Sequence, residues 1–171
     1  MRLFIGEGRC GACHSGPSLS NGEFADVGVS FFAPGGVDSG RSGGIERLRT
    51  SATNWLGPLS DAGADNTRAV STRHVVSEPR HFGEFKVPGL RQLTLTAPYM
   101  HNGSLATIED VVRNYSKLDE ERLHADGERI LRPLNLCDRA AADLAAFLRS
   151  LSAPASDAAA ASAAARPHVR P

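Results

Sequence analysis

The chain has 171 residues, and its 19 Lys and Arg side chains balance 19 Asp and Glu, so the formal net charge is zero. This balance argues against a general nucleic-acid binder and against a polybasic protein of the membrane surface. No apolar run approaches the ~20 residues that a transmembrane helix needs. The length predicts one domain followed by a tail.

The first 22 residues predict a short helix and then a compact turn. Residues 1–9 are typical of the end of a helix that runs into a glycine-bounded turn, and residues 10–22 form a turn segment. This start lacks the apolar stretch of ~7–15 residues and the small-residue cleavage site of a secretory signal. Taken literally, that predicts a cytoplasmic protein.

The middle of the chain has weak hydrophobic periodicity. Residues 23–80 are rich in Gly, Ser and Asp, and several turn signals fall between residues 35 and 44. We expect a long loop with short helical or extended pieces. Loops of this length are usually functional or wrapped around a ligand.

The pattern tightens after residue 80. Residues 85–90 predict an extended segment that then turns. Residues 96–103 predict a loop that turns at Asn102-Gly103. Three leucines, from the end of the first segment to the start of the second, predict a short buried element; they are Leu90, Leu93 and Leu95.

Two helices are expected in the C-terminal half. Thr107 and Asp110 form a capping-box pair at the start of the first. Apolar residues then follow at the spacing of one helical face; they are Ile108, Val111, Val112 and Tyr115. The second helix starts near Asp138, and its apolar stripe consists of Leu144, Phe147, Leu148 and Leu151.

The charged stretch 117–132 is expected to be solvated. Residues 153–171 contain Ala, Ser, Pro and Arg with almost no large apolar side chain. Such a segment buries too little to offset the entropy of ordering. We therefore expect one domain over residues 1–152 and a disordered Ala/Pro-rich tail over residues 153–171.

The motif Cys10-x-x-Cys13-His14 is the attachment pattern of a c-type haem. Two thiols at this spacing reach the two vinyl groups of one porphyrin and form thioethers, while the adjacent imidazole binds the iron from the proximal side. The other ring nitrogen donates to a carbonyl or carboxylate, which fixes the tautomer and the ring orientation. The motif predicts one covalent haem c.

Three other interpretations stay open on the residues alone. A zinc site needs a second Cys or His pair, and neither Cys137 nor His124 has one. A redox Cys-x-x-Cys follows a strand in a βαβ unit, which the glycine-rich surroundings do not suit. The pentapeptide also arises by coincidence. Cys137 itself is expected to be a small buried residue near a helix start.

A six-coordinate haem needs a second axial ligand on its distal side. Thioether and imidazole are the usual low-spin partners, so Met100 or a histidine leads on chemistry alone. Met100 also fits a loop residue that packs on an apolar surface, and Tyr115 fits a core aromatic on its helix. The candidates are Met100, His101, His74, His81, His124 and Tyr115.

Five stretches, the first around the haem motif, carry a family likeness; they are 8–17, 85–91, 95–104, 107–112 and 131–136. Over about residues 3–152, and in this order, the chain resembles the C-terminal haem domain of the bacterial di-haem cytochrome c peroxidase/MauG family. The resemblance implies a mostly α, cytochrome-c-like haem domain with long Gly-rich loops.

The resemblance also implies a function. In the peroxidases, the C-terminal haem takes electrons from a small cytochrome or copper protein and passes them to an N-terminal haem that reduces hydrogen peroxide. In MauG, the paired haems reach a high-valent state that oxidises protein side chains at a distance. The chain would then be the electron-transfer domain of a periplasmic oxidoreductase that acts on hydrogen peroxide.

The same resemblance assigns the distal ligand. The family's Met or Tyr falls fourteen residues after the histidine of the Pro-Tyr-x-His-x-Gly loop, here His101, and that position is Tyr115. Met100 remains the alternative. A thioether favours Fe(II) and raises the potential, whereas a phenolate is a hard anion that favours Fe(III) and lowers it.

Further roles follow from the resemblance alone. An interdomain Ca²⁺ held by backbone carbonyls is implied at Thr96 and Pro98, because hard oxygens suit this cation. His101 matches a histidine near the haem, although a loop-fixing hydrogen bond explains it equally. Arg91 would pair with a haem propionate, or else form a surface salt bridge.

The chain departs from the family in three ways. It has no second Cys-x-x-Cys-His, it carries Asn102 where the family usually has Asp, and it has no secretory signal. We expect a fragment that begins just before the C-terminal haem motif and lacks its N-terminal haem domain. The alternatives are a stand-alone monohaem cytochrome c that carries electrons without peroxidase activity, and a haem-free remnant.

Overall fold

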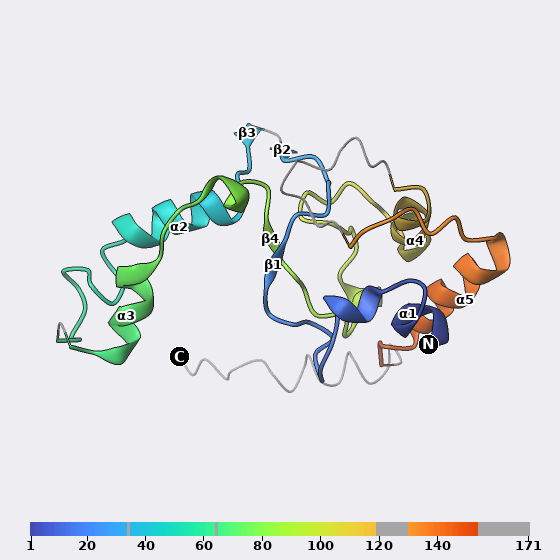
Figure 1. Cartoon of the computed structure of the whole chain (residues 1–171), viewed down its shortest axis with the longest axis horizontal. Helices are drawn as coiled ribbons and strands as arrows, with labels where there is room; N and C mark the ends of the chain where they lie inside the picture. Colours follow the sequence, from blue (N-terminus) through green and yellow to red (C-terminus); the bar gives the residue numbers. More distant parts are fainter. Residues whose placement is uncertain (34, 64, 119–129, 154–171) are drawn as a thin grey trace, which may run out of the picture. The chain divides into compact units, whose positions relative to one another are not determined.

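The computed structural model describes residues 1–33, 35–63, 65–118 and 130–153 (Figure 1). The expected tail and most of the charged stretch 117–132, including His124, lie outside these residues. The chain divides into two compact units. Unit 1 consists of Met1–Asn21, Pro88–Lys117 and the described part of Leu134–Pro171, and unit 2 of Gly22–Val87 and the described part of Leu118–Pro133.

Helices dominate both units, which confirms the mostly α class. Unit 1 contains α1 (Arg2–Ile5), the 3₁₀ helices η1 (Cys10–Ala12) and η3 (Leu93–Leu95), α4 (Ile108–Ser116) and α5 (Asp138–Arg149). Unit 2 contains α2 (Arg41–Thr50), α3 (Thr67–His74), the 3₁₀ helix η2 (Pro79–His81), and the strands β1 (Phe24–Ala25), β2 (Phe32–Ala33), β3 (Gly36–Val37) and β4 (Phe85–Lys86). Within the described ranges, no helix has both the length and the apolarity to cross a membrane.

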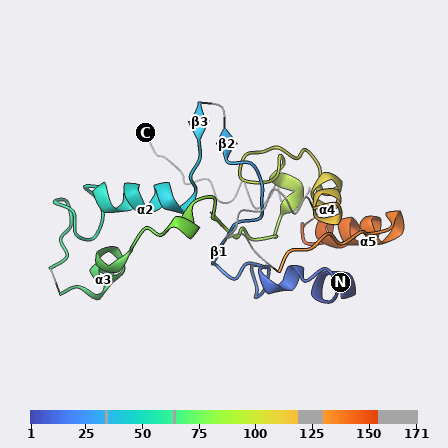
Figure 2. The ribbon, with the colours of Figure 1, turned by 45° about the horizontal axis from the view of Figure 1, so that its top comes forward.

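The strands of unit 2 form two short antiparallel pairs. β1 pairs with β4, which places Phe24 opposite Lys86, and β2 pairs with β3. The first pair joins the two ends of the 22–87 segment. The helices α2 and α3 therefore lie in one long segment whose two ends are paired as strands (Figure 2).

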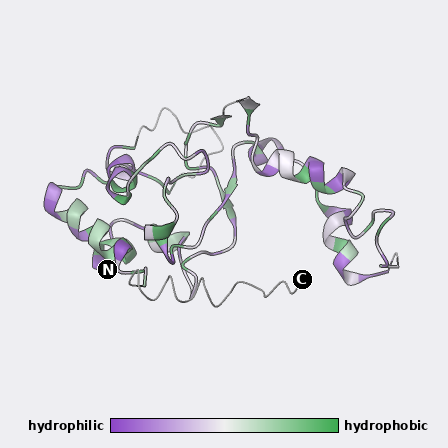
Figure 3. Cartoon of the chain, turned by 180° about the vertical axis from the view of Figure 1, so that it is seen from behind, coloured by the Kyte–Doolittle hydropathy of each residue, from purple (hydrophilic) through white to green (hydrophobic). Residues whose placement is uncertain are grey.

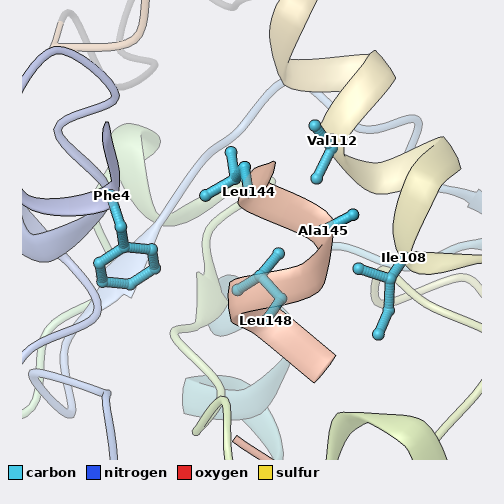
Figure 4. Close-up of a cluster of buried hydrophobic side chains, with 6 residues drawn as sticks. All are labelled: Phe4, Ile108, Val112, Leu144, Ala145 and Leu148. Atoms are coloured by element: carbon cyan, nitrogen blue, oxygen red, sulfur yellow. The ribbon is translucent and has the colours of Figure 1, made fainter. Parts of the chain in front are cut away.

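The core of unit 1 lies where α4 and α5 pack together. Figure 4 shows the α5 side chains between Phe4 on α1 and the two α4 side chains. The buried members of this core are Phe4, Ile108, Val112, Leu144, Ala145 and Leu148. Four of these residues belong to the apolar faces predicted for the two helices, and their burial confirms those faces there; they are Ile108, Val112, Leu144 and Leu148. An ion pair between Arg149 and Glu109 also joins α5 to α4.

The predicted start of α4 is also confirmed. Thr107 Oγ1 accepts from the Asp110 N–H at 3.1 Å, and an Asp110 carboxylate oxygen accepts from the Thr107 N–H at 3.1 Å. These two bonds satisfy N–H groups that the first helical turn leaves without partners.

Two predictions in unit 1 are wrong. Cys137 is exposed, because it is the N-cap of α5 and its carbonyl accepts from the Ala141 N–H at 3.0 Å. Leu95 is 58% exposed. It ends the three-residue helix η3, where successive side chains point in different directions, and only Leu90 and Leu93 pack against the core.

Unit 2 is more helical than the sequence predicts. α2 has ten residues and α3 eight, where a long loop with short pieces was expected. α2 contains Gly43 and Gly44 and buries only Ile45 among its own side chains. Figure 3 shows hydrophilic and hydrophobic residues mixed along both helices, so neither carries the apolar stripe that makes a helix visible in sequence.

Small and polar residues make up much of the core of unit 2. Its buried apolar residues are Ala25, Ile45, Ala69, Val87 and Leu118, and its buried polar residues are Asp26, Asn54, Thr72 and His81. Leu118 was expected in a solvated stretch, and its burial corrects that prediction. Asn54 donates to the Leu48 carbonyl at 2.6 Å and accepts from the Leu56 N–H at 2.8 Å, which anchors the end of α2.

Candidate functional site

The haem motif forms one tight turn at the start of unit 1. Cys10 opens η1, its carbonyl accepts from the His14 N–H at 2.8 Å, and the side chains of Cys10, Cys13 and His14 are all partly buried. Both cysteines are thiols. Burial raises the pKa of the Cys10 thiol, and the charge of a Cys13 thiolate would raise it further. Two thiols and an imidazole therefore lie within five residues.

Gly8 allows this turn to form. A Cβ at Gly8 would lie 2.7 Å from the Leu3 carbonyl oxygen and 3.3 Å from the Cys10 sulfur. Any side chain there would collide with the end of α1. Arg9 then adopts a left-handed conformation with φ of 50° and caps η1.

His14 is held in the form that binds a metal. Its Nδ1 lies 3.0 Å from the Leu19 carbonyl oxygen, which can only accept a hydrogen bond. Nδ1 therefore carries the proton, and Nε2 keeps its lone pair. Burial lowers the pKa of His14, while the carbonyls of Leu19 and Pro88 oppose that shift. The net effect favours the neutral imidazole.

Tyr115 belongs to the same site. It lies in the last turn of α4, is partly buried, and has a pKa raised to about 12. Burial is the largest cause, and the negative charges that Cys10 and Cys13 would carry as thiolates are the other two. The side chains of Cys10 and Cys13 therefore share an electrostatic environment with Tyr115. The structure brings Tyr115 together with the motif across a hundred residues of chain.

The end of α4 is fixed by the segment that precedes α5. The Tyr115 carbonyl accepts from the Leu134 N–H at 3.3 Å, and the Ser116 carbonyl accepts from the Asn135 N–H at 2.9 Å. The buried Ser116 hydroxyl accepts from the Leu136 N–H at 2.8 Å. These bonds set the position of the Tyr115 backbone at the end of α4.

The loop before α4 carries the other candidates. The backbones of Tyr99 and Leu105 pair, and the Gly103 N–H donates to the Met100 carbonyl at 3.2 Å, so the predicted Asn-Gly turn is confirmed. Met100 is partly buried with φ of 68°. His101, by contrast, is exposed on the turn, as are Thr96 and Pro98 before it.

Arg91 contacts the chain beside the motif. It is exposed, and its Nε donates to the Pro17 carbonyl at 3.0 Å. This bond was not foreseen. It joins residues that lie far apart in sequence, and a backbone carbonyl as acceptor leaves no side-chain signature. The glycine at position 89, which allows the two segments to approach, was the signal available.

The remaining histidines lie away from the motif in the chain. His74 is exposed at the end of α3, and His81 is buried in unit 2, where its Nδ1 accepts from the Glu78 N–H at 3.0 Å. Among the residues that the structure describes, no three His, Cys, Asp or Glu side chains gather as a metal site. The donor set of unit 1 is thus two thiols, a neutral imidazole and a phenol, and it fits a c-type haem.

Comparisons with known proteins agree with this donor set. The chain is 31% identical over 156 residues to the cytochrome-c peroxidase IdrP1 of Pseudomonas sp. strain SCT, which covers 89% of the chain. It is 30% identical over 151 residues to the methylamine utilization protein MauG of Methylorubrum extorquens, and this match covers 88% of the chain. The chain is a relative of the cytochrome-c peroxidases and MauG. The resemblance inferred from sequence is confirmed.

A solved structure is also similar. It is a MauG-like protein associated with microbial copper homeostasis, with a TM-score of 0.57 and 25% identity over 88% of the chain. No family model matches the sequence. The chain spans 38% of the length of the IdrP1 relative, 33% of MauG and 42% of the solved structure.

Proposed function

We propose that unit 1 binds one c-type haem through thioethers to Cys10 and Cys13, with His14 as the proximal ligand. The observation that carries the proposal is the contact between His14 Nδ1 and the Leu19 carbonyl, beside two thiols. It prepares Nε2 as a ligand before any metal is bound. The cytochrome-c-like fold belongs to the same proposal, and so does the boundary of the domain at residue 152.

Tyr115 is proposed as the distal ligand, with Met100 as the alternative. Burial, and the charges that Cys10 and Cys13 would carry as thiolates, raise the pKa of Tyr115 to about 12 and so keep its hydroxyl protonated. Thioether formation would remove both ionisable thiols, and a ferric cation would compensate the buried phenolate. Proton loss from Tyr115 is therefore coupled to haem binding. An anionic oxygen ligand stabilises Fe(III), so the potential would be lower than with Met100.

The whole-protein activity proposed is that of a peroxidase or MauG-like oxidoreductase. Haem supplies one-electron chemistry when bound. With a second haem domain, the assembly would transfer two electrons from a small cytochrome or copper protein to hydrogen peroxide, which takes up two protons and yields two molecules of water. This chemistry belongs in the periplasm. A stand-alone electron carrier remains the alternative function.

The roles implied for the loop around residue 100 are part of the proposal. The carbonyls of Thr96 and Pro98 would offer hard oxygens to a Ca²⁺ ion, and their residues are exposed, as an interdomain site requires. His101 would act near the haem. The proposed pairing of Arg91 with a propionate would use donors other than Nε.

The haem proposal is tested by maturing the chain in a periplasm that attaches c-type haem. A pyridine haemochrome spectrum should show one haem per chain in the wild type. Cys13→Ser should lose the two-thioether spectrum, because one bond to the porphyrin is gone. Cys137→Ser is the matched control, since this thiol is exposed at the start of α5. A wild-type chain without haem would refute the proposal.

The activity is tested with the haem-loaded chain, a reduced donor and hydrogen peroxide. Oxidation of the donor only in the presence of a second haem domain supports an electron-transfer half of an enzyme. The electron-carrier alternative holds if the donor exchanges electrons with the chain but peroxide causes no oxidation of the donor, with or without a second haem domain.

A further inference from the structure

The turn that follows the haem motif holds the carbonyl that orients His14. Three backbone bonds close it: the Ser20 N–H donates to the Ser15 carbonyl and the Asn21 N–H to the Cys13 carbonyl, each at 2.8 Å, and the Leu19 N–H donates to the Gly16 carbonyl at 3.1 Å. Leu19 lies in this turn with φ of 53°. A left-handed conformation is unfavourable for a leucine, so the contacts around the turn must hold it.

A second segment, residues 88–91, adds contacts from outside the turn. The Leu90 N–H donates to the Ser18 carbonyl at 3.2 Å, and Arg91 Nε donates to the Pro17 carbonyl at 3.0 Å. Gly89 permits the approach, because a Cβ there would lie 3.0 Å from the Ser18 carbonyl oxygen. The two carbonyls directly before Leu19 are thus both fixed by this segment.

We propose that Arg91 is a positioning residue for the proximal histidine, acting through the Pro17 carbonyl; this inference rests on the proposed haem site. The chain of contacts is short. Arg91 holds Pro17, the turn then keeps Leu19 left-handed, and the Leu19 carbonyl accepts the proton of His14 Nδ1. Without Arg91, the turn can relax toward an ordinary backbone conformation and withdraw that carbonyl.

Arginine suits this task because Nε–H has a fixed direction in the guanidinium plane. Lysine places a methylene group where Nε stands, and glutamine is too short to replace the planar group. The role differs from pairing with a propionate, which depends on charge. A geometric role and a charge role can therefore be separated by substitution.

The test uses the ferric haem-loaded chain with cyanide bound on the distal side, so that variants differ only on the proximal side. Proton NMR measures how fast the His14 Nδ1 proton exchanges with solvent. Weakening of the neutral hydrogen bond between His14 Nδ1 and the Leu19 carbonyl should speed this exchange about fivefold to tenfold in Arg91→Gln. The His14 Nδ1 proton of Arg91→Lys should also exchange faster than that of the wild type, although this variant keeps the positive charge.

Two controls separate a local effect from general loss of stability. Arg139→Gln removes an exposed arginine of α5 in the same unit and should leave the His14 proton unchanged. The backbone amide of the buried Leu148 should exchange at the wild-type rate in every variant. If Arg91→Gln is too unstable to load haem, Arg91→Lys alone decides the question.

Wild-type exchange of the His14 proton in a haem-loaded Arg91→Lys variant would overturn the positioning role and leave the proposed haem site intact. The same conclusion would follow if His14 and Leu148 exchange accelerated equally in the Arg91 variants. A wild-type chain that takes up no haem would instead refute the proposed function, and this inference with it.

Discussion

The two units are built on different kinds of core. Unit 1 buries large apolar side chains between α4, α5 and α1, such as Phe4 and Leu148. Unit 2 buries mostly small or polar residues, such as Ala69 and Asn54, and exposes much of its larger apolar surface. Its exposed large apolar residues are Phe32, Val37, Leu48, Trp55, Leu56, Leu59, Val70, Val76 and Phe82.

This difference matches what each unit has to do. Unit 1 holds the four side chains of the proposed haem site, which come from the motif turn and from α4, and a close-packed apolar core fixes these two elements against each other. In unit 2, hydrogen bonds anchor chain segments, as Asn54 does at the end of α2. We therefore expect apolar truncations to be most costly in unit 1 and polar truncations to matter more in unit 2.

The largest effect is expected for Leu148→Ala in unit 1. Leu148 is buried in the core near the end of α5, so the substitution leaves a cavity and should lower the free energy of unfolding by about 2–5 kcal/mol. Urea denaturation followed by circular dichroism measures it. Leu95→Ala, at an exposed leucine of the same unit, is the control and should change it by less than about 0.5 kcal/mol.

A smaller effect is expected for Asn54→Ala in unit 2. The buried amide loses its bonds to the Leu48 carbonyl and the Leu56 N–H, which should cost about 1–3 kcal/mol. Asn54→Asp keeps the acceptor for Leu56 but not the donor, so it separates the two bonds. If urea unfolding of Asn54→Ala matched the wild type, the view of unit 2 as anchored by polar contacts would be wrong.

Removing the cap of α4 should cost less again. Thr107→Ala loses the side-chain bond to the Asp110 N–H and should destabilise unit 1 by about 0.5–2 kcal/mol. The Thr107 hydrogen bonds lower the pKa of Asp110, so this group stabilises the fold above the usual carboxyl pKa. That contribution should fade as the pH falls through the lowered pKa. An Asp110→Asn variant with the same acid denaturation profile would contradict this account.

The smallest effect is expected for Leu59→Ala in unit 2, where the side chain is 72% exposed. The free energy of unfolding should change by less than about 0.5 kcal/mol. Equal losses for this variant and for Leu148→Ala would erase the contrast between the two units.

The sequence predicted unit 1 much better than unit 2, for a physical reason. α4 and α5 carry apolar residues at helical spacing, and the Thr107–Asp110 pair marks where α4 begins, so both were visible. α2 contains two glycines and buries Ile45 alone, because its unit packs through small residues and hydrogen bonds. Such contacts leave no periodic pattern.

The sequence could predict those residues of the candidate site that act through side chains of recognisable chemistry. Cys10, Cys13 and His14 follow from the motif, and Tyr115 followed from the resemblance. The Leu19 carbonyl and the contact between Arg91 and Pro17 did not, because backbone acceptors have no sequence signature. The orientation of His14 therefore required the structure.

The central claim is that unit 1 carries a covalent haem at the motif turn, and peptide mass spectrometry tests it most directly. Trypsin cleaves after Arg9 and Arg41, so both motif cysteines fall in one peptide, residues 10–41. After periplasmic maturation, we predict that this peptide carries the mass of one haem and that the peptide with Cys137 carries none. A motif peptide of unmodified mass, from a chain matured beside a control cytochrome that does acquire haem, would contradict the account.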